Sequence, residues 1–332
     1  KEIIMKAIKY TSYGSPEVLK LVELEKPVAG DNEILIRIHA TTVTATEATF
    51  RKGEPYFSRL FTGLTKPKFT TLGEELSGEV VALGKDVTRF KLGDEVFGTA
   101  GPQFGANAEH LTSPEDGVLV IKPSNLNHEE AAASVDGFLT ALPFLRDTGN
   151  IQKGQKVLIY GASGSIGSAA VQVANYYGAE VTAVCSTANV EWVKSLGAKH
   201  VIDYTRQDFS KSGMTYDIIF DAVGKISFPQ SKRSLTPQGI FLEAGFSMGF
   251  LSQALLTSMG SGKKARTAAT GLRKPEERTQ DLELLKDLIQ SGQIKPVVDR
   301  IYPLEQIAEA HRYVELGHKK GNVAITVRGK AS

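Results

Sequence analysis

The stretch that decides the fold is residues 156–187, which read KVLIYGASGSIGSAAVQVANYYGAEVTAVCST. A short apolar run rich in β-branched residues leads into a glycine-rich turn, and an alanine-rich apolar segment follows. That order predicts a strand, a tight turn and a helix. A second apolar run at 180–184 predicts another strand, so the whole stretch reads as one βαβ unit.

The turn carries glycines at three-residue spacing, Gly161, Gly164 and Gly167, and Ser163 interrupts the strict G-x-G-x-x-G pattern. Glycines allow a sharp turn and a close approach of the backbone to a pyrophosphate, whose charge the start of the helix favours. A plain βα turn without a ligand is the alternative. The strand–turn–helix–strand context favours dinucleotide binding, and the residues that we expect at the phosphates are Ser163, Gly164, Ser165, Ile166 and Gly167.

Length and composition indicate a globular protein of two domains. The chain has 332 residues, of which 41% are hydrophobic and 23% are charged, and its net charge is +2. Because charges of both signs are interspersed, we expect neither a nucleic acid nor an acidic membrane as partner. No apolar run reaches the roughly 20 residues that span a bilayer. The first residues contain no signal-peptide core, so we expect a cytoplasmic protein.

The chain before the βαβ unit reads as β structure. Alternating apolar residues predict strands within 5–40 and again within 72–98, so the first 120 or so residues resemble one barrel-like domain. Residues 41–71 look irregular, and loops on a β scaffold are where substrate contacts usually lie.

A capped helix starts at Asn127, and βα alternation continues to about residue 260. Continuous apolar strands that end in glycine predict a doubly wound parallel sheet, with ligands at the carboxyl ends of its strands. The apolar stretch 246–270 fits a substrate lid, a subunit contact or plain core packing. Helices at 281–290 and 304–316 and a strand at 321–327 are expected to pack back on the β domain.

Taken together, these segments resemble the medium-chain dehydrogenase/reductase superfamily, in its zinc-free quinone-oxidoreductase-like branch. The resemblance rests on residues 73–84, 93–98, the glycine turn, 196–204, 220–224 and 321–323. It implies a mostly-β GroES-like catalytic domain formed by residues 1–125 and 273–332, an α/β Rossmann NADPH-binding domain at 126–272, and usually a homodimer.

Zinc-dependent relatives hold a catalytic metal with Cys, His and Cys, and a structural metal with four cysteines. At the corresponding catalytic positions this chain has Thr44, Glu74 and Asp136, and its single cysteine, Cys185, excludes a multi-cysteine zinc site. Two carboxylates and a hydroxyl could hold a hard cation. We expect a site without zinc.

The end of the second strand predicts the choice of nucleotide. NAD-selective folds place Asp or Glu there to bind the ribose, whereas this chain has Ser186 and Thr187, which favour NADPH. Tyr204 resembles the family tyrosine at the cofactor phosphates, and Thr140 the threonine near the nicotinamide amide. The residues that we expect to contact the cofactor are Thr140, Ser163, Gly164, Ser165, Ile166, Gly167, Cys185, Ser186, Thr187, Asn189, Tyr204, Val223, Gly224, Gly245, Phe246 and Asn322.

Without a metal to polarise a simple ketone, hydride transfer suits an acceptor that is already electron-poor, namely a quinone or an α,β-unsaturated carbonyl. Quinone reductases of the family often carry Asn and Tyr where this chain has Thr44 and Thr49. Thr44, Thr49 and Tyr56 are therefore the candidate proton donors, with solvent as the alternative. Two other functions stay open: a non-catalytic NADPH-binding sensor or regulatory module, and a zinc-type alcohol dehydrogenase.

Overall fold

The computed structural model describes residues 3–245, 248–258 and 260–327. The chain divides into two compact units. Unit 1 contains Lys1–Val135, Lys274–Gln290 and Lys295–Ser332, and unit 2 contains Asp136–Arg273 and Ser291–Ile294. The chain passes from unit 1 to unit 2 after Val135 and returns to unit 1 after Arg273. The sequence suggested divisions after residues 125 and 272.

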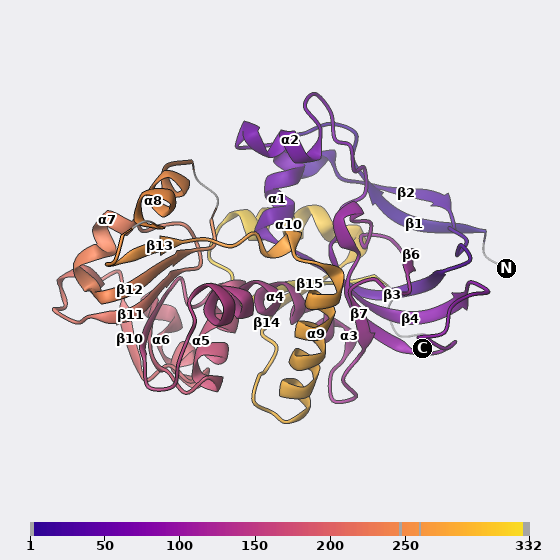
Figure 1. Ribbon diagram of the computed structural model, residues 1–332. Coiled ribbons are helices and arrows are strands. Elements are labelled where there is room, and N and C mark those ends of the chain that lie inside the picture. Colours follow the sequence, from indigo (N-terminus) through magenta and orange to yellow (C-terminus); the bar gives the residue numbers. More distant parts are fainter. Residues whose placement is uncertain (1–2, 246–247, 259, 328–332) are drawn as a thin grey trace. The chain divides into compact units, whose positions relative to one another are not determined.

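Unit 2 is built on a parallel sheet, as the apolar strand pattern predicted. In the described part of the chain it has six strands, in the order β10-β9-β8-β11-β12-β13, and every neighbouring pair is parallel (Figure 1). The strand order reverses between β8 and β11, which creates a switch point at the carboxyl edge. The strands are β8 (Lys156–Tyr160), β9 (Glu180–Cys185), β10 (His200–Asp203), β11 (Tyr216–Asp221), β12 (Leu235–Glu243) and β13 (Lys264–Arg266).

The helices of unit 2 follow the βα rhythm of the sequence. The helix α5 packs against β8 and β9, α6 against β10, and α8 against β13. Their bounds are α4 (Val135–Pro143), α5 (Ser165–Tyr176), α6 (Val190–Ser195), α7 (Phe228–Ser231) and α8 (Met248–Ser258), and a π-helical turn, Phe144–Thr148, continues α4. The stretch 246–270, which the sequence left without an assigned structure, therefore supplies a helix and the edge strand.

Unit 1 is mostly β structure, also as predicted. A seven-stranded sheet of described residues has the path β14-β15-β3-β4-β5-β7, with β6 paired to β3, and β1 and β2 form a separate antiparallel pair. Near its end the chain returns to this unit, because β15 pairs with β3. The strands are β1 (Ile4–Lys9), β2 (Lys20–Glu25), β3 (Glu33–Val43), β4 (Glu75–Leu83), β5 (Glu95–Thr99), β6 (His110–Pro114), β7 (Leu119–Ile121), β14 (Val298–Pro303) and β15 (Asn322–Thr326).

The helices of unit 1 include one that corrects the sequence reading of residues 41–71 as irregular. Residues Ala45–Lys52 form α1, which begins at the N-cap Thr44 and ends at Gly53, whose φ is 66°. Its threonines are weak helix formers, but tertiary packing buries Arg51 completely and stabilises the helix. The other helices are α2 (Arg59–Thr62), α3 (His128–Ala133), α9 (Pro275–Gln290) and α10 (Ile307–Glu315).

The sequence located the start of α3 accurately. The helix predicted at Asn127 begins there with a complete capping box to Glu130.

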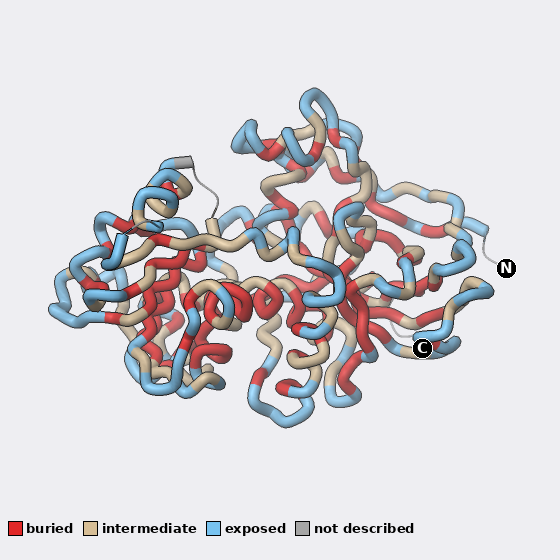
Figure 2. The backbone as a smooth tube through the Cα atoms, viewed as in Figure 1, coloured by how far each residue is buried: buried red, intermediate tan, exposed pale blue. Residues whose placement is uncertain are grey.

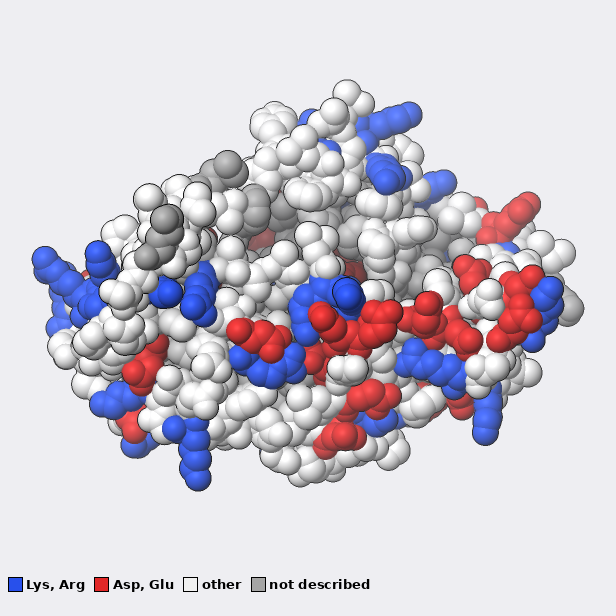
Figure 3. Space-filling model, in the orientation of Figure 1, with Lys and Arg blue, Asp and Glu red and all other residues white. Residues whose placement is uncertain are grey.

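Each unit has its own buried centre, and in Figure 2 the strands of both sheets run mainly through buried positions. Acidic and basic side chains are interspersed on the face drawn in Figure 3. None of the described helices is long and apolar enough to cross a membrane.

Candidate nucleotide site

The glycine turn after β8 is so compact that side chains would not fit at Gly161 and Gly167. A Cβ on Gly167 would lie 2.1 Å from the carbonyl oxygen of Gly161, and Gly161 itself has a φ of 76°. The amides of Gly161 and Ala162 both donate to the carbonyl of Val184 on β9 (3.1 and 3.0 Å). The turn is thereby fixed at the carboxyl edge of the sheet, against the neighbouring strand.

The start of α5 fits a phosphate group. Gly164 is the N-cap of α5. Because glycine has no side chain, the first amides of the helix have no side-chain cap. A Cβ there would meet only the Gly161 carbonyl oxygen, at 3.6 Å, so that side of the turn is open. Ser165, the first residue of α5, donates to the Asp136 carboxylate at 3.1 Å, which ties α4 to the turn. Thr140 lies one turn further along α4 and is half-buried.

The second strand ends in a small hydroxyl cluster. Thr187 donates to Asp203 Oδ2 at 2.5 Å and lies 3.1 Å from the hydroxyl of Thr205. Asn189 donates to the Ser186 hydroxyl at 3.1 Å. Asp203 ends β10, the strand next to β9, and hydrogen bonds from Thr187 and Thr205 hold the pKa of its carboxyl below the ordinary value. Ser186 and Thr187 therefore do have a carboxylate beside them, which corrects the sequence argument.

A cation also stands at this cluster. The Arg206 Nε lies 3.6 Å from Asp203 Oδ2, and its side chain is 74% exposed. Tyr204 precedes it in the same turn, half exposed, and its amide donates to the Cys185 carbonyl at 3.1 Å. The Cys185 side chain is buried, and burial together with the Asp203 charge raises the pKa of the thiol to about 11.

At the other side of the switch point, the loop after β11 is organised by a buried carboxylate. Asp221 accepts hydrogen bonds from the amides of Val223 (3.0 Å), Gly224 (2.9 Å) and Ile226 (2.8 Å). Burial raises the pKa of Asp221, and these backbone donors oppose that effect. Gly245, which follows β12, lies beside Gly224. Phe246 lies outside the described residues.

Four predicted site residues belong to unit 1. Thr44 accepts a hydrogen bond from the Glu47 amide at 3.1 Å, and Thr49 lies within α1. Tyr56 is 73% exposed, and Arg59 lies 4.6 Å above its ring. Asn322, at the start of β15, donates to the Val297 carbonyl at 3.2 Å.

The positions that correspond to zinc ligands have partners within their own units. Glu74 forms an ion pair with Arg278 at 3.2 Å, and Asp136 accepts the Ser165 hydroxyl. Among the described residues, no three His, Cys, Asp or Glu side chains are grouped so that they could hold a metal ion.

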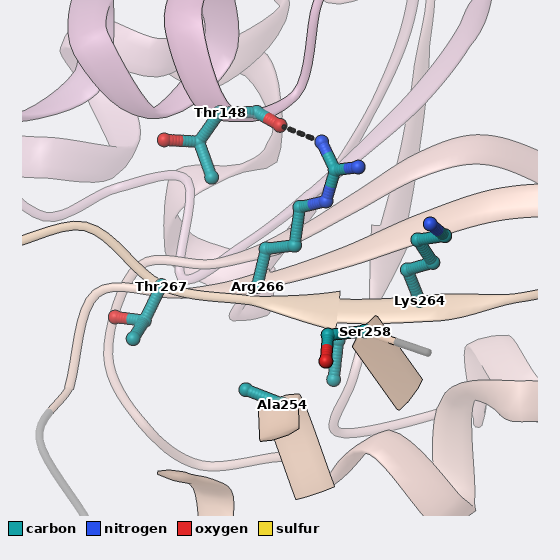
Figure 4. Close-up of a pocket in the computed structure, with 7 residues that line it drawn as sticks. Thr148, Ala254, Ser258, Lys264, Arg266 and Thr267 are labelled. Carbon is teal, nitrogen blue, oxygen red and sulfur yellow. Dashed lines mark hydrogen bonds between the residues drawn. The ribbon is translucent and has the colours of Figure 1, made fainter. Parts of the chain in front are cut away.

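A pocket of about 280 Å³ lies at the edge of the unit 2 sheet, away from the glycine turn. Figure 4 shows Arg266 of β13 reaching across to the Thr148 carbonyl, to which it donates at 2.9 Å, with Ala254 and Ser258 of α8 close to the strand. Among the residues that the structure describes, this pocket shares no lining residue with the predicted cofactor contacts.

Comparison with known proteins agrees with this architecture. Residues 30–123 match the alcohol dehydrogenase GroES-like domain family, and residues 196–325 match a zinc-binding dehydrogenase family. The 2-methylene-furan-3-one reductase of Solanum lycopersicum is 32% identical over 97% of this chain and 79% of its own length. The chain belongs to the medium-chain dehydrogenase/reductase superfamily, in its quinone oxidoreductase-like branch.

Two further comparisons support this branch. The chloroplastic NADPH-dependent alkenal/one oxidoreductase of Arabidopsis thaliana is 31% identical over 97% of this chain and 79% of its own length. The structure of the quinone oxidoreductase from Coxiella burnetii has a TM-score of 0.87, at 28% identity, and covers 98% of this chain and 100% of that one.

In this medium-chain dehydrogenase/reductase, the carboxyl edge of the unit 2 sheet forms a rim. Sequence reasoning did not include four charged residues of this rim: Asp203, Arg206, Asp221 and Glu243. Asp203 and Arg206 follow β10, and their proximity to Thr187 becomes visible only once β10 is known to pair with β9. Asp221 and Glu243 each end an apolar strand, and a carboxylate in that position was the available signal.

Proposed function

We propose that this oxidoreductase uses NADPH to reduce a quinone or an α,β-unsaturated carbonyl compound, without zinc. The observation that carries the proposal is the tight turn Gly161–Gly167 with the uncapped start of α5, at the carboxyl edge of a parallel sheet. Relatives named alkenal/one oxidoreductase and quinone oxidoreductase support the substrate class.

Residues of unit 2 would hold the nucleotide along the rim. The amides at the start of α5 would bind the pyrophosphate, and Ser186, Thr187 and Arg206 the ribose end. The loop after β11 and Gly245 would receive the nicotinamide half. When bound, the cofactor supplies a hydride, and the protein orients the acceptor and excludes water.

Selectivity for NADPH rests on Arg206 and the hydroxyl cluster. The carboxylate of Asp203 is an obstacle to a 2′-phosphate, but Thr187, Thr205 and the exposed guanidinium of Arg206 surround it. Because the Arg206 side chain is exposed and already directed to this cluster, it supplies the positive charge that Ser186 and Thr187 lack.

Thr44, Thr49 and Tyr56 are the proposed donors of the proton to the reduced substrate. For Thr44, T44S keeps both the hydroxyl and the cap of α1 and T44A removes both, whereas T44D keeps the cap without the hydroxyl and shows which of the two losses lowers kcat. A donor role predicts that kcat is retained in T44S and falls in T44A, and that Y56F and T49V have the same kind of effect if their hydroxyls act.

The deciding experiment measures NADPH oxidation with 9,10-phenanthrenequinone and, separately, with an alkenal. Turnover of either supports the proposal. Binding of NADPH with no turnover of either compound would instead favour a regulatory NADPH-binding module. One tightly held zinc per purified chain, found by metal analysis, would favour the zinc-type alcohol dehydrogenase. We also propose a homodimer, which light scattering tests by the mass in solution.

A further inference from the structure

Two carboxyl groups lie side by side at the carboxyl edge of the unit 2 sheet. Asp221 ends β11, Glu243 ends β12, and the two are register partners in this parallel pair. Both are buried, with 0% and 7% of their surfaces exposed. Side chains that share a register in neighbouring strands lie on the same face of the sheet, so the two groups act on each other.

The two carboxyls have different surroundings. Asp221 accepts three backbone amides, which favour its ionised form. The carboxyl of Glu243, in contrast, receives no hydrogen bond from the residues that the structure describes. Glu243 is held through its backbone instead, because the Thr267 hydroxyl donates to its carbonyl at 3.1 Å.

Glu243 changes its protonation near neutral pH. Burial, and next the charge of Asp221, raise the pKa of Glu243 to about 7. The other charged groups on neighbouring elements are directed elsewhere: Lys225, on the loop after β11, is exposed, and Arg266 of β13 donates to the Thr148 carbonyl. Asp221 is therefore the charge that acts on it.

Glu243 also stands where the nicotinamide half of a bound dinucleotide would come. A Cβ on Gly245 would lie 3.3 Å from Glu243 Oε1 and 3.6 Å from the Cα of Gly224. The hydroxyl cluster after β9 is at the ribose end, and the glycine turn after β8 is at the pyrophosphate. A dinucleotide that crosses the switch point then extends its second half over the ends of β11 and β12.

We propose that Glu243 distinguishes the two redox states of the nicotinamide, with its ionised form favouring the oxidised cofactor and its protonated form the reduced one. The oxidised ring is a cation and the reduced ring is neutral, so a nearby buried carboxylate attracts only the oxidised ring. This inference rests on the proposed function, because it requires that a nicotinamide dinucleotide binds. By linkage, binding of NADP⁺ must release a proton that NADPH binding retains.

The test measures the dissociation constants of NADP⁺ and NADPH between pH 6 and pH 8, for the whole protein and for E243Q. Their ratio is the informative quantity, because the 2′-phosphate, which both carry, titrates near pH 6 and cancels. If NADP⁺ lowers the pKa of Glu243 by one unit, the ratio shifts about fivefold toward NADP⁺ as pH rises. In E243Q the ratio should not vary with pH.

E180Q is the matched control, since Glu180 begins β9 at the opposite edge of the same sheet, and it should behave as the unaltered protein. Calorimetry in two buffers of different ionisation enthalpy gives a second readout that needs no variant. At pH 7, NADP⁺ binding should release about 0.4 proton more than NADPH binding. A ratio independent of pH in the unaltered protein, or equally dependent on pH in E243Q, overturns the role of Glu243 alone. Absence of binding by both nucleotides overturns the proposed function as well.

Discussion

At the scale of single residues, the proposed preference for NADPH depends on side chains from two neighbouring strands. Thr187 follows β9, whereas Asp203 and Arg206 come from the end of β10, and hydrogen bonds join the two sets. A carboxylate and a guanidinium thus stand together where we propose that the ribose binds. In the proposed site, the balance between these two charges would decide how strongly a 2′-phosphate is favoured.

We predict that R206A raises the KM for NADPH about tenfold and leaves the KM for NADH nearly unchanged. The change removes one charge-assisted contact to the 2′-phosphate, worth about 1.4 kcal/mol. Steady-state kinetics with both nucleotides measures the effect. The control is R233A, because Arg233 is exposed on another part of unit 2. Equal losses with NADPH and NADH would contradict the assignment.

The raised pKa of Glu243 also predicts how the stability of the protein without cofactor depends on pH. The pKa of the Glu243 carboxyl is raised from its ordinary value of 4.5 to about 7 in the folded protein. Between these pH values the folded state therefore binds more protons than the unfolded state. The contribution of Glu243 to stability is therefore complete below about pH 4.5 and is lost as pH rises through 7.

We predict that E243Q and the unaltered protein have similar melting temperatures at pH 5, and that E243Q is the more stable at pH 8, by up to about 3 kcal/mol. The amide cannot ionise, so it avoids the cost of a buried charge beside Asp221. Thermal unfolding across this pH range measures the difference. A difference that does not grow with pH would show that Glu243 ionises normally.

At the scale of elements, the turn before α5 depends on glycine at one position above all. Gly167 lies against the Gly161 carbonyl, so any side chain there must displace the helix from the strand. We predict that G167A weakens NADPH binding at least tenfold, because the amides of α5 move away from the pyrophosphate.

Fluorescence titration with NADPH measures this loss. G271A is the control, since a Cβ on Gly271 meets nothing within 4 Å in the same unit. Retention of full affinity in folded G167A would mean that the turn does not bind the pyrophosphate.

Elements with strong local signals were predictable from the sequence, and those stabilised by tertiary contacts were not. The β8–α5–β9 unit and the capping box of α3 follow from apolar periodicity and cap residues. The helix α1 depends on burial of Arg51, and the three-residue strand β13, rich in Lys and Arg, has no periodicity to detect. The grouping of charged side chains at the rim could be predicted only from the strand order, which the spacing of residues alone does not give.

At the scale of the whole molecule, a ligand confined to unit 2 should stabilise that unit. We predict that NADPH at one hundred times its dissociation constant adds about 2.7 kcal/mol to the free energy of unfolding of unit 2. Denaturant unfolding with and without NADPH measures the gain, and NADH at equal concentration is the comparison. A gain as large with NADH would contradict selectivity for the 2′-phosphate.

The path of the chain has a consequence for the order of folding during synthesis. Strand β15 pairs with β3, Val323 opposite Val43, so the sheet of unit 1 cannot be completed until β15 has left the ribosome. The six described strands of unit 2 are available once Arg266 has emerged. Domains generally fold as units while the chain is being made. Unit 2 can therefore fold while the edge of β3 still lacks its partner β15.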